Sequence, residues 1–249
     1  MKITAEQFFD LERRIIESGA DADLDSFATI RERLKSRAPV DADEFARQAC
    51  YVVLAGGFSQ KTAKKIHSQI MEILNTSRHP GAGRGPLHDN KLDADDMAVD
   101  PGLRRDDARY NDGDLYETLF SIFHNKNKIN AIMKLWSGRQ NYRDIYYALP
   151  GQGERLKYLA NLPHIGKITA NHLARNLGEN MVKYDIWIQR LAVADTPLAA
   201  RIDNGDLDPA VKSACDEMFA DIERSTGLPR GYIDVVLWKA CQTGLLLKE

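Results

Sequence analysis

Apolar residues recur at helical spacing along most of this chain, and the strand-like alternation of apolar and polar positions is nearly absent. The first apolar face consists of Phe8, Phe9, Leu11, Ile15 and Ile16. A cap at Asp25-Ser26 precedes a second face. Further helices are expected over residues 43–55, 59–75, 125–136, 142–149, 154–161, 208–223 and 232–241. About ten helices joined mostly by short links indicate an all-α fold.

One segment, residues 76–113, interrupts this pattern. It is rich in Gly, Pro, Asp and Arg and has almost no large apolar side chains. Such a segment cannot bury enough surface to offset the entropy lost on ordering, so we expect a disordered or loop insertion without catalytic residues. The helical pattern resumes at Asp114, where Asp114-x-x-Glu117 is an expected capping box.

The net charge of −2 gives no overall indication of a nucleic-acid partner, but the charge is unevenly distributed. Residues 114–192 hold eleven Lys and Arg against six Asp and Glu, which leaves this segment at +5 and the remainder at −7. A basic middle is compatible with phosphate binding. The amphipathic start of the chain lacks the apolar core of a signal peptide, so we expect a cytoplasmic protein.

The three cysteines, Cys50, Cys215 and Cys241, are far apart in the sequence. Their number and spacing favour neither a disulfide framework nor a zinc or iron–sulfur site. We expect each to be a small buried apolar residue in a reducing compartment.

The strongest motif is LPHIGKITA, residues 162–170. One helix is expected to end before Pro163 and another to begin at Gly166, where the missing side chain lets a phosphate approach unpaired backbone N–H groups. Leu162 and Ile165 are expected to fix this hairpin to the core. The hairpin therefore predicts a grip on the DNA backbone that reads no bases. The alternative interpretation is an ordinary helix end with a Pro-Gly turn.

This segment resembles the hairpin of the helix-hairpin-helix (HhH-GPD) DNA glycosylases, the superfamily of endonuclease III, the adenine glycosylase MutY and the 8-oxoguanine glycosylases. Their hairpin reads L-P-G-V-G-x-x-T-A, and this chain departs from it at His164 and Ile165. The superfamily places an aspartate about eighteen residues beyond the hairpin, before a hydrophobic helix that ends in arginine. Asp185 and Arg190 stand at those places. Weaker similarity extends through FHNKNKINAIMKLW and VVLAGGFSQKTAKKI.

The resemblance implies a two-lobed all-α fold. Residues 46–179 would form a central lobe that contains the hairpin and the insertion. Residues 1–45 and 180–249 would form a terminal lobe, with the base-binding cleft between the two lobes.

Asp185 is the candidate catalytic residue. Cleavage of an N-glycosidic bond develops positive charge on the deoxyribose, and a carboxylate beside C1′ stabilises that charge and can activate water. An aspartate at this place can also cap the following helix, and the two roles are compatible.

A second position distinguishes two reaction types. Superfamily members that also cut the strand carry a lysine two residues after the second hairpin glycine, where this chain has Ile168. Lys167 is one residue earlier and is turned away by ~100° on a helix. Lys183 is a less favoured amine. We therefore expect a monofunctional glycosylase. A bifunctional glycosylase/AP lyase that uses a lysine and a non-catalytic DNA-structure-binding protein stay open as alternatives.

The resemblance also implies a set of binding residues. The expected DNA-backbone contacts are Pro163, His164, Gly166, Lys167 and Thr169. Main-chain carbonyls of Ala160, Leu162 and Ile165 would hold a monovalent cation, K⁺ or Na⁺; no cofactor is required, and no iron–sulfur cluster is expected. Candidates for the base-flipping wedge and the base pocket, each of which can instead belong to the core, are Phe58, Gln60, Tyr51, Trp136, Tyr184 and Trp187.

The expected partner is double-stranded DNA with a damaged or modified base, bound by a monomer at the nucleoid. Oxidised purines, alkylated purines and deaminated bases all stay open as substrates, because one sequence does not define the shape of the pocket.

Overall fold

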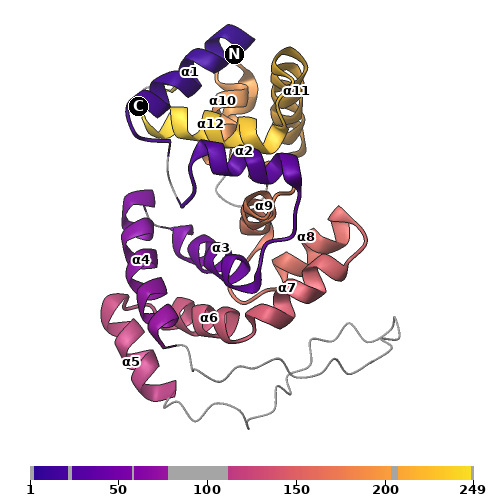
Figure 1. The fold of residues 1–249 in the computed structure, drawn as a ribbon. Coiled ribbons are helices and arrows are strands. Elements are labelled where there is room, and N and C mark those ends of the chain that lie inside the picture. Colours follow the sequence, from indigo (N-terminus) through magenta and orange to yellow (C-terminus); the bar gives the residue numbers. More distant parts are fainter. Residues whose placement is uncertain (1–2, 22–23, 58, 78–111, 203–206, 248–249) are drawn as a thin grey trace.

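The computed structural model describes residues 3–21, 24–57, 59–77, 112–202 and 207–247 (Figure 1). Within these residues the chain forms twelve α-helices, one 3-10 helix and no strand, which confirms the all-α prediction. The helices are α1 (Ala5–Glu17), α2 (Phe27–Ser36), α3 (Ala42–Ala55), α4 (Gln60–Thr76), α5 (Asp112–Ile122), α6 (Lys126–Ser137), α7 (Arg139–Ala148), α8 (Gln152–Ala160), α9 (Lys167–Asn176), α10 (Ile186–Val193), η1 (Pro197–Arg201), α11 (Pro209–Thr226) and α12 (Arg230–Gln242).

Buried apolar side chains gather in two clusters. The central cluster is built from α3 to α9, and the terminal cluster from α1, α2, α10, α11 and α12. In Figure 1 the helices of the terminal cluster form the upper half of the molecule, α3 to α8 form the lower half, and α9 lies between them. The chain passes from the terminal to the central cluster between Leu34 and Phe45, and returns between Leu177 and Val182. The lobe boundaries expected from the sequence stay a prediction.

Short-range capping explains where most helices begin. The side chains of Thr4, Ser26, Asp41, Ser59, Asn125, Asp185 and Asp208 each accept a backbone N–H from the first turn of the helix that follows. The capping box expected at Asp114 is wrong, because α5 begins two residues earlier, at Asp112. Asp114 lies inside the first turn, where its negative charge interacts favourably with the positive end of the helix dipole.

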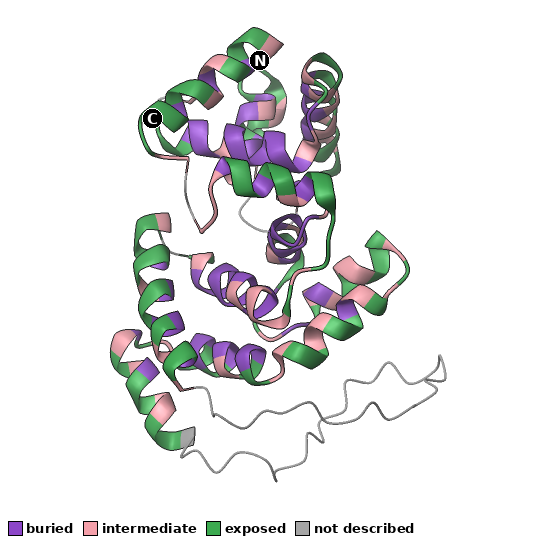
Figure 2. Cartoon of the chain, in the orientation of Figure 1, coloured by how far each residue is buried: buried purple, intermediate pink, exposed green. Residues whose placement is uncertain are grey.

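The buried face of α1 is narrower than the sequence predicted. Phe8, Leu11 and Ile15 are buried, whereas Phe9 and Ile16 are 42% and 48% exposed. Adjacent residues on a helix are turned by ~100°, so packing on one side cannot cover both members of each pair. Figure 2 shows the exposed outer side of α1 in green and the largely buried α12 in purple.

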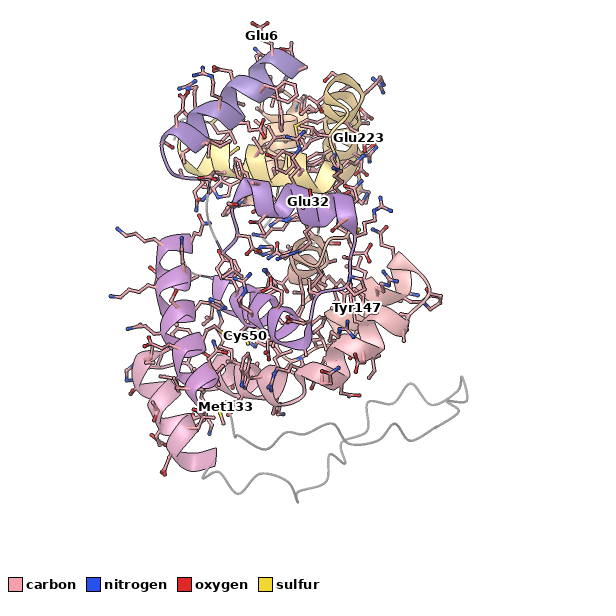
Figure 3. The ribbon with its side chains drawn as sticks, viewed as in Figure 1. Glu6, Glu32, Cys50, Met133, Tyr147 and Glu223 are labelled. Carbon is pink, nitrogen blue, oxygen red and sulfur yellow. The ribbon has the colours of Figure 1, made fainter. Side chains whose placement is uncertain are left out.

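Polar contacts join the two clusters at α2, α3 and α9. The guanidinium of Arg33 on α2 donates to Asp25 (2.9 Å), to Glu44 on α3 (2.8 Å) and to the carbonyl oxygen of Asn176 on α9 (2.7 Å). Figure 3 labels Tyr147 on α7. Its hydroxyl accepts the Val40 N–H from the connection between α2 and α3 at 3.1 Å. These contacts fix the hairpin helix α9 against the terminal helices.

Most of the expected insertion, residues 76–113, lies outside the described residues; α4 ends at Thr76 and α5 begins at Asp112. None of the described helices is both long enough and apolar enough to span a bilayer. Cys50, Cys215 and Cys241 are buried and free, as expected for small core residues.

Candidate active site and nucleic-acid interface

The hairpin joins α8 to α9 through a tight turn. The Leu162 N–H donates to the carbonyl oxygen of Leu159 (3.1 Å), and the Ile165 N–H donates to that of Leu162 (3.0 Å). Leu162 and Ile165 are buried in the central cluster, which agrees with their expected role as anchors of the hairpin. The turn between them is thereby held against the core while its outer side is free to meet a ligand.

His164 occupies the tip of this turn in the left-handed region, with φ +60°. The resembling motif has glycine here, which adopts this conformation without a steric penalty, whereas other residues lose about 1 kcal/mol or more. Histidine is among the residue types that occur there more often than most. The side chain is exposed. The departure from the motif therefore preserves the turn and adds an imidazole to the surface of the hairpin.

The N-terminus of α9 is the anion-binding feature of the hairpin. The Gly166 N–H donates to Oγ1 of Thr169 (2.8 Å), and the Thr169 hydroxyl donates to the Gly166 carbonyl oxygen (3.0 Å). No side chain caps α9 at Gly166. Helix N-termini carry unpaired N–H groups and a partial positive charge, which suit a phosphate. Lys167 is exposed on the first turn and adds a full positive charge.

Asp185 lies at the N-terminus of α10. Its Oδ1 accepts the N–H groups of Trp187 (3.1 Å) and Ile188 (3.2 Å), so the expected capping role is confirmed. Its Oδ2 lies 3.2 Å from Nζ of Lys183. The Asp185 side chain is 13% exposed, which shields it from most solvent without closing it off. One carboxylate oxygen thus caps the helix, while the other faces the Lys183 ammonium.

Residues of α12 contact the loop before Asp185. Asp234 is fully buried, and its Oδ2 accepts the Lys183 N–H at 3.4 Å and contacts the guanidinium of Arg175 on α9. The Gly231 N–H donates to Oδ1 of Asn180 at 2.9 Å. Burial raises the pKa of the Asp234 carboxyl, while the adjacent Arg175 lowers it. The position of Asp185 therefore depends on a buried carboxylate from the far end of the chain.

The pocket candidates divide between the two clusters. Tyr51 and Trp136 are buried in the central cluster, whereas Tyr184 and Trp187 are half-buried against the terminal cluster. The Tyr184 hydroxyl donates to Oδ1 of Asp216 (2.5 Å). Tyr51 meets the His172 ring of α9 edge-on, with centroids 6.1 Å apart. Burial lowers the pKa of His172, and the nearby charges of Arg175 and Lys183 lower it further. Of the four candidates, Tyr184 and Trp187 lie beside Asp185, and the Trp187 N–H donates to Asp185.

The wedge candidates lie at the turn between α3 and α4. Phe58 lies outside the described residues. Gln60 begins α4, and its Oε1 accepts from Nζ of Lys239 on α12 at 2.7 Å. The Lys128 ammonium donates to the carbonyl oxygens of Gly56 and Leu54 (3.5 Å for the latter), and burial lowers the pKa of Lys128. This lysine thus fixes the end of α3 at the turn where the wedge is expected.

Comparison with known proteins gives a likeness in structure only. No family model matches the sequence, and no curated protein matches it. The crystal structure of Methanocaldococcus jannaschii 8-oxoguanine glycosylase/lyase in complex with 15mer DNA containing 8-oxoguanine is 16% identical, with a TM-score of 0.62 over 98% of this chain and 99% of that chain. The 8-oxoguanine DNA glycosylase of Thermotoga maritima is 15% identical, with a TM-score of 0.57 over 98% of this chain and 97% of that chain.

This chain has the all-α fold of these 8-oxoguanine glycosylase structures. The coverage of nearly the whole length of each structure means that the likeness includes both clusters and the hairpin between them. The part of the chain that matches these structures therefore includes both α9, which begins after Gly166, and α10, which begins after Asp185.

The sequence did not predict that two residues of α12, Asp234 and Trp238, contact Lys183 in the loop before Asp185. The Trp238 ring has Nζ of Lys183 at 5.4 Å and Nζ of Lys239 at 5.3 Å from its centroid. Asp234 is four residues before Trp238, so both lie on one side of the helix. The spacing was visible in the sequence, but no local pattern links α12 to a loop about fifty residues earlier.

The hairpin is compatible with the expected monovalent cation. The Leu162 carbonyl oxygen accepts one hydrogen bond, from Ile165, and a carbonyl oxygen has a second lone pair that a hard cation can use. The site needs no acidic side chain. Among the described residues there is also no group of three His, Cys, Asp or Glu that could hold a metal ion.

Proposed function

We propose that this protein is a DNA glycosylase of base excision repair, which binds double-stranded DNA and releases a damaged base. The observation that carries the proposal is the setting of Asp185. Its largely buried carboxylate begins the helix that follows the hairpin helix in a glycosylase fold, and Oδ2 is not used by the cap. The uncapped N-terminus of α9 supports the binding of a DNA phosphate on the same framework.

In the proposed reaction Asp185 acts on the flipped-out nucleotide. As the bond between C1′ and the base breaks, positive charge develops on the deoxyribose, and the negative Oδ2 stabilises it. The same oxygen accepts a proton from the attacking water. Oδ1 keeps its two N–H partners throughout, so the carboxylate stays oriented.

We propose that base release is monofunctional, with water and not a hairpin amine displacing the base. Ile168 supports this assignment, because the position that carries the lysine in strand-cutting relatives holds an apolar side chain that is 37% exposed. The DNA-backbone contacts of Pro163, His164, Gly166, Lys167 and Thr169 are part of the same proposal. Carbonyls of Ala160, Leu162 and Ile165 would hold a K⁺ or Na⁺ ion that bridges the hairpin to a phosphate.

The solved structures of similar fold suggest 8-oxoguanine as the first lesion to test, since the names of the Methanocaldococcus jannaschii and Thermotoga maritima proteins both specify it. We further propose that the protein works as a monomer at the nucleoid, where its DNA substrate is found.

The test is a panel of duplexes, each with one 8-oxoguanine, 3-methyladenine, hypoxanthine or uracil. The protein is incubated with each duplex, and strand breaks are compared with and without hot alkali. Alkali-dependent breaks at one lesion support monofunctional base release. Breaks without alkali support the bifunctional alternative. DNA binding without base release from any lesion would support the non-catalytic DNA-binding alternative.

A further inference from the structure

Lys183 places an amine at the oxygen of Asp185 that does not cap α10. Its Nζ lies 3.2 Å from Oδ2, while Oδ1 is held by two N–H groups of α10. A deoxyribose C1′ that approaches Oδ2 therefore also comes within reach of the amine. The Lys183 side chain is 20% exposed, so the amine is accessible to a bound nucleotide.

The surroundings of Lys183 fix this position from two sides. Its backbone N–H donates to the buried carboxylate of Asp234 (3.4 Å), and its Nζ lies 5.4 Å from the centre of the Trp238 ring. Asp234 and Trp238 are one turn apart on α12, so one rigid helix holds both the main chain and the amine of this residue.

Two other lysines are less suited to the role. Lys239 also approaches the Trp238 ring, but it is only 5% exposed, and its ammonium donates to Gln60 (2.7 Å) and Gln242 (3.1 Å). Lys167 is exposed on the hairpin, and in the part of the chain that the structure describes its ammonium makes no ion pair with Asp185.

We propose that Lys183 captures the abasic product of this enzyme as a reversible imine. The proposal rests on the proposed function for its substrate, because base release leaves a deoxyribose whose opened form has an aldehyde at C1′. The Lys183 ammonium passes one proton to Oδ2 of Asp185, and the nitrogen lone pair forms a bond to C1′. The hydroxyl of the resulting carbinolamine takes the proton back from Asp185 and leaves as water, which gives the protonated imine beside the Asp185 carboxylate.

This sequence of steps balances without an oxidant or a reductant. A C=N double bond replaces the C=O double bond of the aldehyde, one water molecule leaves, and hydrolysis reverses the reaction with the DNA strand intact. The capture is therefore a second step after hydrolytic base release, and it retains a reactive abasic site on the protein.

The test uses the full chain and a duplex that already contains an abasic site, so that base release is not needed. Sodium cyanoborohydride reduces an imine to a stable amine, and the cross-linked complex is measured on a denaturing gel at saturating DNA. We expect a cross-link with the wild-type protein and a loss of at least about tenfold with Lys183→Gln. The exposed Lys134→Gln is the matched control and should cross-link like the wild type.

Two further measurements show whether the loss of the cross-link in Lys183→Gln comes from the missing amine or from a change in folding. Peptide mapping of the adduct should find it on Lys183. Lys183→Cys treated with bromoethylamine, which rebuilds an amine of similar length, should recover the cross-link; the three native cysteines are buried. An adduct on Lys167 or on the N-terminal amine, or no adduct at all, would overturn the proposal. Base release from a lesion without any adduct would leave the proposed function standing, whereas capture of abasic DNA without base release would refute only the proposed function.

Discussion

Arg175 and Asp234 form a buried ion pair that connects the hairpin helix α9 to α12. The two side chains are 6% and 0% exposed. Because the same Asp234 oxygen accepts the Lys183 N–H, one carboxylate holds both the helix that begins at Gly166 and the loop that carries Asp185. The proposed DNA contact at the hairpin and the candidate catalytic carboxylate of Asp185 are thus connected through Asp234.

The first prediction concerns this pair. Arg175→Met leaves a buried carboxylate without its counter-ion and should lower the free energy of unfolding by about 3–5 kcal/mol. The double variant Arg175→Met/Asp234→Leu removes both charges and should recover most of that loss. Urea denaturation at pH 7 measures both. A double variant as unstable as the single one would show that the pair is not the source of the loss.

The second prediction concerns stability in mild acid. The buried His67 ring is paired through Nε2 with the Arg47 carbonyl oxygen at 3.0 Å, and burial lowers its pKa to about 4. In the unfolded chain a histidine titrates near pH 6.5, so below that pH the unfolded state binds a proton that the folded state does not. Stability should therefore fall between pH 6.5 and 4, by at most about 3 kcal/mol from this group.

Urea denaturation at pH 7 and pH 4.5 checks this expectation, with His67→Gln as the comparison. His172, whose pKa is also lowered by burial, acts in the same direction and keeps part of the effect in the variant. An equal pH dependence of the wild type and His67→Gln would refute the assignment to His67.

The third prediction concerns the hairpin charge. Lys167→Gln should weaken binding to any DNA sequence, because it removes a phosphate contact and not a base contact. The slope of log Kobs against log salt should become shallower by about 0.9. Fluorescence anisotropy across a salt series measures the slope, and Lys35→Gln, on the exposed side of α2, is the control. An unchanged slope would exclude Lys167 as a phosphate contact.

The fourth prediction concerns the left-handed turn at His164. His164→Val should lower the free energy of unfolding by about 1–2 kcal/mol, because a β-branched side chain is strained at φ +60°. His164→Gly removes that strain but frees the unfolded chain, so it should change stability by less than about 1 kcal/mol. Thermal denaturation distinguishes the two, and a valine variant as stable as the wild type would contradict the turn geometry.

Features encoded within a few residues were predictable from the sequence. The anchors Leu162 and Ile165 and the cap at Asp185 follow from helical spacing and capping chemistry, and the structure has them as expected. Two local predictions were wrong. The helix α5 begins before the expected cap at Asp114. Phe9 is exposed, because the apolar pattern does not show how much of a helix face the neighbouring helices cover.

The support of the candidate site was not predictable in the same way. Asp234 and Trp238 reach the loop of Lys183 only because α12 packs beneath it, and that packing depends on contacts across the whole terminal cluster. Burial of a charged residue such as Asp234 also contradicts what its residue type suggests. Such a residue is identified by its partners, which only the fold brings together.

Asp185 is the residue on which the proposed base release depends most, and Asp185→Asn tests this role most directly. Asparagine also caps helices, so the variant should fold and bind lesion DNA like the wild type. It lacks the negative charge, so single-turnover base release from the lesion that the wild type excises should slow by about 10²–10⁴-fold. Asp221→Asn, an exposed change on α11, controls for handling of the protein. Base release by Asp185→Asn at close to the wild-type rate would contradict the assignment of this carboxylate.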